Sequence, residues 1–231
     1  MKNGQKTIFI PVHETFRIAA VLAVVGGFLD AYTYRLRGGV FANAQTGNLV
    51  LLGINLAEGR FRQAMYYVAP IVAFALGVFI TEMLKKYVSR REFMMFEHWI
   101  IAMELALLFA IGFLPLSVPN GVVNVAISFV CSLQVNSFRK VKNLPYATTM
   151  CTGNLRSGTE KLFHSLVNKE KGAGRDAAHY FGIIILFVLG AFLGDRLTVI
   201  FTTQSIWFCC AALMFVYAAM GRERRRQEME K

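Results

Sequence analysis

The segment "FANAQTGNLVLLG" (41–53) places four polar side chains and a glycine within an otherwise apolar stretch. A related segment, "YATTMCTGNLRSG" (146–158), repeats the Thr-Gly-Asn-Leu motif later in the chain. Each copy follows an apolar segment of similar length. This repetition predicts two halves of related structure, and it guides the interpretation of the rest of the chain.

The composition is typical of an integral membrane protein. Of the 231 residues, 55% are hydrophobic, 20 are Phe and only 17% are charged, whereas a soluble domain carries about 25% charged residues. Apolar runs such as "IAAVLAVVGGFL" (18–29) and "IIILFVLGAFLG" (183–194) approach, with their flanks, the roughly 20 residues that a helix needs to cross a bilayer. Helices satisfy their own backbone where water is absent. The sequence therefore predicts an all-α polytopic membrane protein.

The basic residues predict an orientation for about six transmembrane helices. We place these helices at 16–35, 64–84, 98–115, 120–138, 177–198 and 204–221. Twenty of the 25 Lys and Arg residues then fall on one side, which the positive-inside rule makes cytoplasmic together with both termini. The opposite side carries four outer arginines, Arg35, Arg37, Arg60 and Arg62. We expect the basic loops to contact anionic lipid head groups rather than nucleic acid.

The two halves of the chain also match outside the motif. Residues 67–84 align without gaps on 180–197, with seven of 18 positions identical, and 28–35 match 132–139. We expect one membrane domain (1–231) with a first repeat (16–115), a second repeat (120–221) and a basic tail (222–231). Each repeat has an odd number of crossings, so the second enters the bilayer from the opposite side. Such inverted repeats are common in secondary transporters.

Two acidic residues, Asp30 and Glu104, fall well inside predicted crossings, whereas Glu82 and Asp195 lie close to helix ends. An ionisable side chain inside a crossing is costly and is a functional candidate. Asp30 follows "VVGGFL" in the first helix, and Glu104 has apolar neighbours on both sides in the third. The alternative is that each carboxylate is paired and holds helices together. The fourth helix adds a polar stripe that lines a path or bonds neighbouring helices: Asn124, Ser128, Cys131 and Gln134.

The motif segments are the third candidate. Gly38-Gly39 and Pro145 are expected to break the preceding helices. Two broken segments meeting near the midplane would form a polar site for a solute or ion, with the following residues: Asn43, Gln45, Thr46, Gly47, Asn48, Thr152, Gly153 and Asn154. The alternative is that the motifs cap two surface helices. Three placements of residues 40–58 are left open: they span the bilayer, re-enter it or lie at its surface.

The motifs of enzymes are missing from the sequence. It has no metal-ligand spacing, no nucleophile–base arrangement and no phosphate-binding loop, so we expect neither an enzyme nor a cofactor or metal site. The four cysteines form no C-x-x-C pair and are expected to act as small apolar residues.

The block "GGFLDAYTYRLRGGVFANAQTGNLVLLG" (26–53), together with the second TGNL, resembles the YoaK-like family of bacterial multi-spanning membrane proteins. The resemblance covers nearly the whole chain and implies a bacterial cytoplasmic membrane location. It implies no substrate, because the family is one of unknown function.

The residues themselves favour a secondary transporter or permeation protein for a small polar or charged solute. The alternatives are a structural or regulatory membrane protein and a passive channel, with a homo-oligomer left open. The sign of the solute's charge is also left open. Asp30 suits a proton or a cation, and helix N-termini suit an anion.

Overall fold

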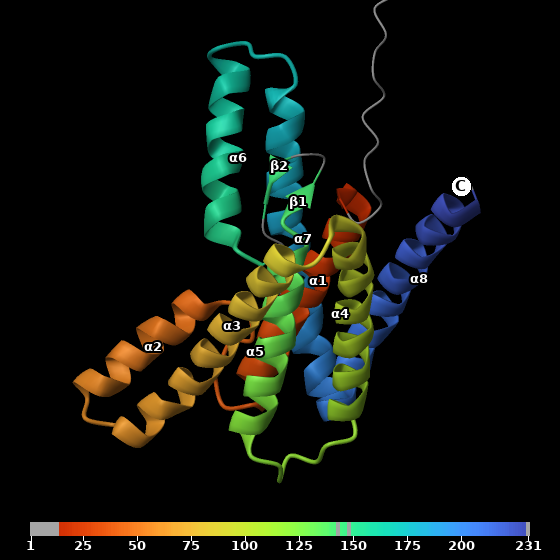
Figure 1. Cartoon of the computed structure of the whole chain (residues 1–231). Helices are drawn as coiled ribbons and strands as arrows, with labels where there is room; N and C mark the ends of the chain where they lie inside the picture. The colour runs from red at the N-terminus through yellow and green to blue at the C-terminus, as the bar shows by residue number, and fades with distance from the viewer. Residues whose placement is uncertain (1–13, 142–143, 147–148, 230–231) are drawn as a thin grey trace, which may run out of the picture.

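The computed structural model describes residues 14–141, 144–146 and 149–229 (Figure 1). The helices are α1 (Phe16–Leu36), α2 (Gln45–Ala57), α3 (Phe61–Tyr87), α4 (Arg90–Ile111), α5 (Asn120–Ser137), α6 (Cys151–Leu166), α7 (Ala173–Phe201) and α8 (Trp207–Met229). Two short strands, β1 (Lys140–Val141) and β2 (Leu144–Pro145), pair antiparallel, and a 3-10 turn, η2 (Thr202–Ile206), joins α7 to α8. The fold is thus essentially all-helical, as predicted.

The glycine pair after α1 reverses the chain. Gly38 and Gly39 adopt φ values of +86° and +73°, which favour residues without a Cβ. Residues 40–44 then return along α1, and α2 starts at Gln45. The predicted helix break at this glycine pair is confirmed.

Each of four long helices packs against a helix from the other half of the chain. Helix α1 lies along α7, and α5 lies along α3. The shorter helices α2 and α6 lie along α3 and α7, at opposite ends of the bundle (Figure 1). Helix α4 contacts both α5 and α8. Helix α1 starts and α8 ends at the same end of the bundle (Figure 1).

Small residues permit these close contacts. A Cβ on Gly27 of α1 would collide with the Phe187 carbonyl of α7, and a Cβ on Gly77 of α3 would meet Ser132 and the Phe129 carbonyl of α5. Close backbone approach at small residues is typical of helix packing in membranes. Gly190 of α7 likewise lies against the backbone of Val24 in α1.

The outer faces of the long helices are apolar as well. Phe79 of α3 is 64% exposed and Ile185 of α7 is 66% exposed. A helix that is hydrophobic all round belongs in a membrane or a large core. In the described part of the chain, three helical stretches are long and apolar enough to cross a membrane: Phe16–Leu36, Phe61–Tyr87 and Ala173–Arg222. The last of these comprises α7, η2 and most of α8.

Candidate functional site

Asp30 lies on α1 against the returning segment 42–44. It is 5% exposed, and its Oδ1 accepts a 2.6 Å hydrogen bond from the backbone N–H of Asn43. The amides of Ala42 and Ala44 also face this carboxylate. The Asn43 side chain donates to the Gly26 carbonyl at 3.3 Å. Asp30 Oδ2 and Asn43 Oδ1 make no hydrogen bond within the described residues.

The segment before the second motif reaches the same part of α1. Thr149 is buried, and a Cβ on Gly26 would collide with its methyl group. Cys151, the first residue of α6, interacts electrostatically with Asp30. Gly26 lies midway along α1. The segments preceding both motifs thus meet the centre of one helix, and α2 and α6 lead away from there to opposite ends of the bundle (Figure 1).

The polar side chains of the first motif form hydrogen bonds within their own loop. The fully buried Asn48 accepts from the Phe41 N–H at 2.9 Å and donates to the Phe41 carbonyl at 2.8 Å. It also donates to Gln45 Oε1, and Gln45 donates to the Ala42 carbonyl. Gly47 lies beneath the Phe41 ring, whereas Thr46 is exposed. Asn48, Gln45 and Gly47 therefore shape the loop.

The second motif borders an open space. Asn154 is buried, but Thr152 and Gly153 are exposed, and a Cβ on Gly153 would meet nothing within 4 Å. Gly153 and Asn154 line a cleft of about 490 Å³, here named the α3–α5–α6 cleft. Its other polar lining residues are Asn136, Arg139, Tyr146 and Ser157, and its apolar ones are Phe74, Val78, Val135 and Met150.

Glu104 lies in the interior between α4 and α5. It is fully buried, and its Oε2 accepts a 2.6 Å hydrogen bond from Gln134. Its Oε1 makes none within the described residues.

The rest of the polar stripe on α5 is also buried. Asn124 donates to the Arg37 carbonyl at 2.8 Å. Its Oδ1 and the Ser128 hydroxyl make no hydrogen bond within the described part of the chain. The stripe thus connects the end of α1 with α4 across the bundle interior.

Arg37, one of the four arginines expected on the outer side, has a fully buried side chain. The Tyr32 hydroxyl faces the guanidinium, whose three nitrogens form no geometrically defined hydrogen bond to a described residue. No period or motif in the sequence signals this burial, which depends on the reversal of the chain at Gly38-Gly39.

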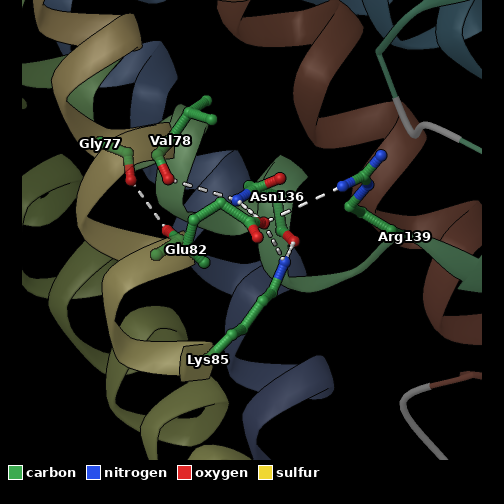
Figure 2. Close-up of polar contacts among 7 residues, drawn as sticks. Gly77, Val78, Glu82, Lys85, Asn136 and Arg139 are labelled. Carbon is green, nitrogen blue, oxygen red and sulfur yellow. Dashed lines mark hydrogen bonds and ion pairs between the residues drawn. The ribbon is translucent and has the colours of Figure 1, made fainter. Parts of the chain in front are cut away.

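A polar cluster joins α3 to α5 beside the cleft (Figure 2). Asn136 donates to Glu82 at 2.8 Å and to the Val78 carbonyl at 3.4 Å. Lys85 donates to Glu82 at 2.9 Å and to the Asn136 carbonyl at 2.6 Å. Arg139 lies 3.9 Å from the same carboxylate. Asn136 and Arg139 therefore belong both to this cluster and to the cleft.

Metal ligands are not grouped in the described residues, where no three His, Cys, Asp or Glu side chains lie together. Cys131, Cys209 and Cys210 are free and buried, and Cys151 is free and partly buried.

Comparison with known proteins gives two matches. Residues 18–219 match the family model described as "Protein of unknown function (DUF1275)". The chain is 25% identical over 184 residues to "UPF0700 transmembrane protein YoaK" of Bacillus subtilis (strain 168), a match that covers 76% of this chain and 80% of that protein. No solved structure matches. The resemblance inferred from residues 26–53 is confirmed.

Proposed function

The chain belongs to the DUF1275 family, and from that premise we propose that this membrane protein is a proton-coupled secondary transporter of a small solute. The observation that carries the proposal is the pair of interior carboxylates. Asp30 and Glu104 are both buried, and neither lies in an ion pair within the described residues. Acidic side chains placed so inside a membrane are typical of proton relays in pumps and transporters.

The exchanged helix pairs support two inverted repeats. In the sequence alignment α1 corresponds to α5 and α3 to α7, so the pairs α1–α7 and α3–α5 are equivalent under exchange of the halves. The polar contacts follow the same rule. Arg35 lies 3.6 Å from Asp195, and Arg139 lies 3.9 Å from Glu82, with each arginine contacting the acid of the other repeat.

This symmetry supplies a mechanism for alternating access. The pre-motif segments meet at the middle of α1, and the α2–α3 and α6–α7 hairpins lie at opposite ends (Figure 1). Rocking one repeat against the other would open the interior to each end in turn. Protonation of Asp30 and Glu104 would couple this movement to a proton gradient.

We place the α6 end of the bundle in the cytoplasm, with six crossings and both termini on that side. Fourteen of the 25 Lys and Arg residues lie in 139–175 and 221–231 or at Arg17. These segments adjoin the end where α1 starts and α8 ends (Figure 1). The positive-inside rule supports this orientation in a bacterial cytoplasmic membrane.

A structural role is the second candidate function, since the polar atoms of Asn48 form hydrogen bonds within its own loop.

Uptake by the purified full chain in liposomes distinguishes the transport function from the structural role. With an imposed pH gradient and a panel of labelled metabolites, a transporter accumulates at least one solute. Asp30→Asn retains an oxygen that can accept from Asn43 but removes the ionisable group, and should abolish accumulation. Exposed Thr46→Ala is the control. Gradient-independent leakage would instead indicate a channel.

A further inference from the structure

The α3–α5–α6 cleft has the size of a small-molecule site. Its volume of about 490 Å³ falls in the range of roughly 300–1,000 Å³ that ligand pockets occupy. Its wall combines apolar side chains such as Phe74 and Val135 with a few polar groups. This combination suits a ligand with an apolar body and one polar end.

The charged group that lines the cleft is Arg139, whose side chain is 63% exposed. Tyr146 also lines the cleft, but its hydroxyl is buried and its side chain packs in an apolar cluster with Ala19, Ala23 and Ile183. The carboxylate neighbour of Arg139, Glu82, is bound more closely by Lys85, at 2.9 Å against 3.9 Å (Figure 2). Arg139 can therefore exchange this long contact for a ligand's carboxylate.

The corresponding place in the first repeat is closed. There the Phe41 ring covers Gly47, whereas Gly153 is open. The residue aligned with Phe41 is Ala147, which lies outside the described residues and carries no ring. The two copies of the motif have thus diverged: the Phe41 ring covers the first, and the second borders the α3–α5–α6 cleft.

We infer that the α3–α5–α6 cleft binds a small organic monocarboxylate, with Arg139 holding the carboxylate and Phe74 and Val135 contacting the apolar body. This inference rests on the proposed function, since it names the class of solute carried. Together with the interior carboxylates, it makes the protein a proton–carboxylate symporter.

Melting of the detergent-purified full chain tests the assignment. Butyrate, hexanoate and benzoate should raise the melting temperature by about 2–4 °C at saturation, whereas the matching amines and neutral amides should not. Arg139→Gln should weaken the apparent affinity at least about tenfold. The matched control is Arg35→Gln, which removes the equivalent arginine of the other repeat and should leave the affinity unchanged.

Gly153→Leu provides a second test that does not depend on removing a polar group. A Cβ at this position meets nothing within 4 Å, and replacing a helical glycine favours the helix. This variant should keep or raise the melting temperature without ligand and abolish the carboxylate response, because the leucine would fill the cleft.

Three results would overturn the assignment: equal stabilisation by amines, an equal loss in Arg35→Gln and Arg139→Gln, or stabilisation by phosphatidylglycerol and by no soluble carboxylate. Failure of transport is distinguishable. Carboxylate binding without uptake would refute the transport function and support the assignment of the cleft as a carboxylate site. Uptake of another solute without carboxylate binding would refute that assignment and support the transport function.

Discussion

Gln134 of α5 donates a 2.6 Å hydrogen bond to Glu104 of α4 in the fully buried interior. The other oxygen of Glu104 has no hydrogen-bond partner among the described residues. The bond explains how the carboxylate is oriented. The unpaired oxygen leaves a place for a proton.

Glu104→Gln should separate the chemical role of this residue from its packing role. The substitution retains the shape and removes the acid, so the free energy of unfolding should stay within about 1 kcal/mol of the parent. Proton-driven uptake should be lost. Paired melting and liposome uptake measurements check this, with Glu104→Ala as the cavity-forming comparison. Full uptake by Glu104→Gln would remove Glu104 from the coupling mechanism.

Asn48→Ala should destabilise the protein without any involvement of a solute. It removes two hydrogen bonds to the Phe41 backbone and one to Gln45. At about 1 kcal/mol for each bond, the loss is roughly 3 kcal/mol. The exposed Thr46→Ala in the same motif should change the melting temperature little. Equal melting of the two variants would contradict the structural role assigned to Asn48.

Gly27→Ala tests the α1–α7 contact. A Cβ there would collide with the backbone carbonyl of Phe187, which cannot turn away as a side chain can. We expect a loss of about 1–3 kcal/mol in the free energy of unfolding. Gly53→Ala is the matched control in α2, where a Cβ meets nothing within 4 Å, and should be neutral or stabilising. If Gly27→Ala melts like Gly53→Ala, the two helices are farther apart than described.

The sequence was sufficient for four of the long helices and for the break after α1, whereas α4 starts and α8 ends eight residues from the predicted positions. Long apolar runs and the φ preference of Gly38-Gly39 are local signals, and they predict α1, α3, α5 and α7 to within a few residues. The burial of Asp30 and Glu104 was also foreseeable, because each lies within a single apolar run.

Contacts made by returning loops were not foreseeable. Arg37 is buried because residues after Gly39 fold back along α1, and Tyr146 borders a cleft only because α6 starts beside α3 and α5. Neither placement follows from a period or a motif. The surroundings of Gly47 and Gly153 likewise differ: the Phe41 ring covers Gly47, and a Cβ on Gly153 would meet no described atom within 4 Å.

The orientation can be tested by cysteine labelling in intact cells. Cysteines introduced at the exposed Glu58 and Lys171 should react with opposite preference, because α2 and α6 lie at opposite ends of the bundle. A membrane-impermeant maleimide should label Glu58→Cys from outside, and Lys171→Cys only after permeabilisation. The native Cys131, Cys209 and Cys210 are buried and should remain unlabelled. The reverse pattern would invert the proposed topology.

Arg37→Met should not destabilise the protein, although it removes a fully buried arginine. Truncating one partner of a buried ion pair usually costs several kcal/mol because the other charge is left unpaired. Here no described carboxylate forms an ion pair with the guanidinium, and Tyr32 retains its contact with the Thr203 carbonyl at 3.5 Å.

A methionine of similar length would fill the space without the desolvation cost of a charge. We therefore expect the free energy of unfolding to stay level or rise by about 1–3 kcal/mol. Arg37→Ala, which leaves a cavity, should lower it. Denaturant melts of the three proteins check this order. If Arg37→Met and Arg37→Ala lose equal stability, the guanidinium makes a stabilising contact. If Arg37→Met keeps its stability but loses uptake, Arg37 lies on the path of the solute.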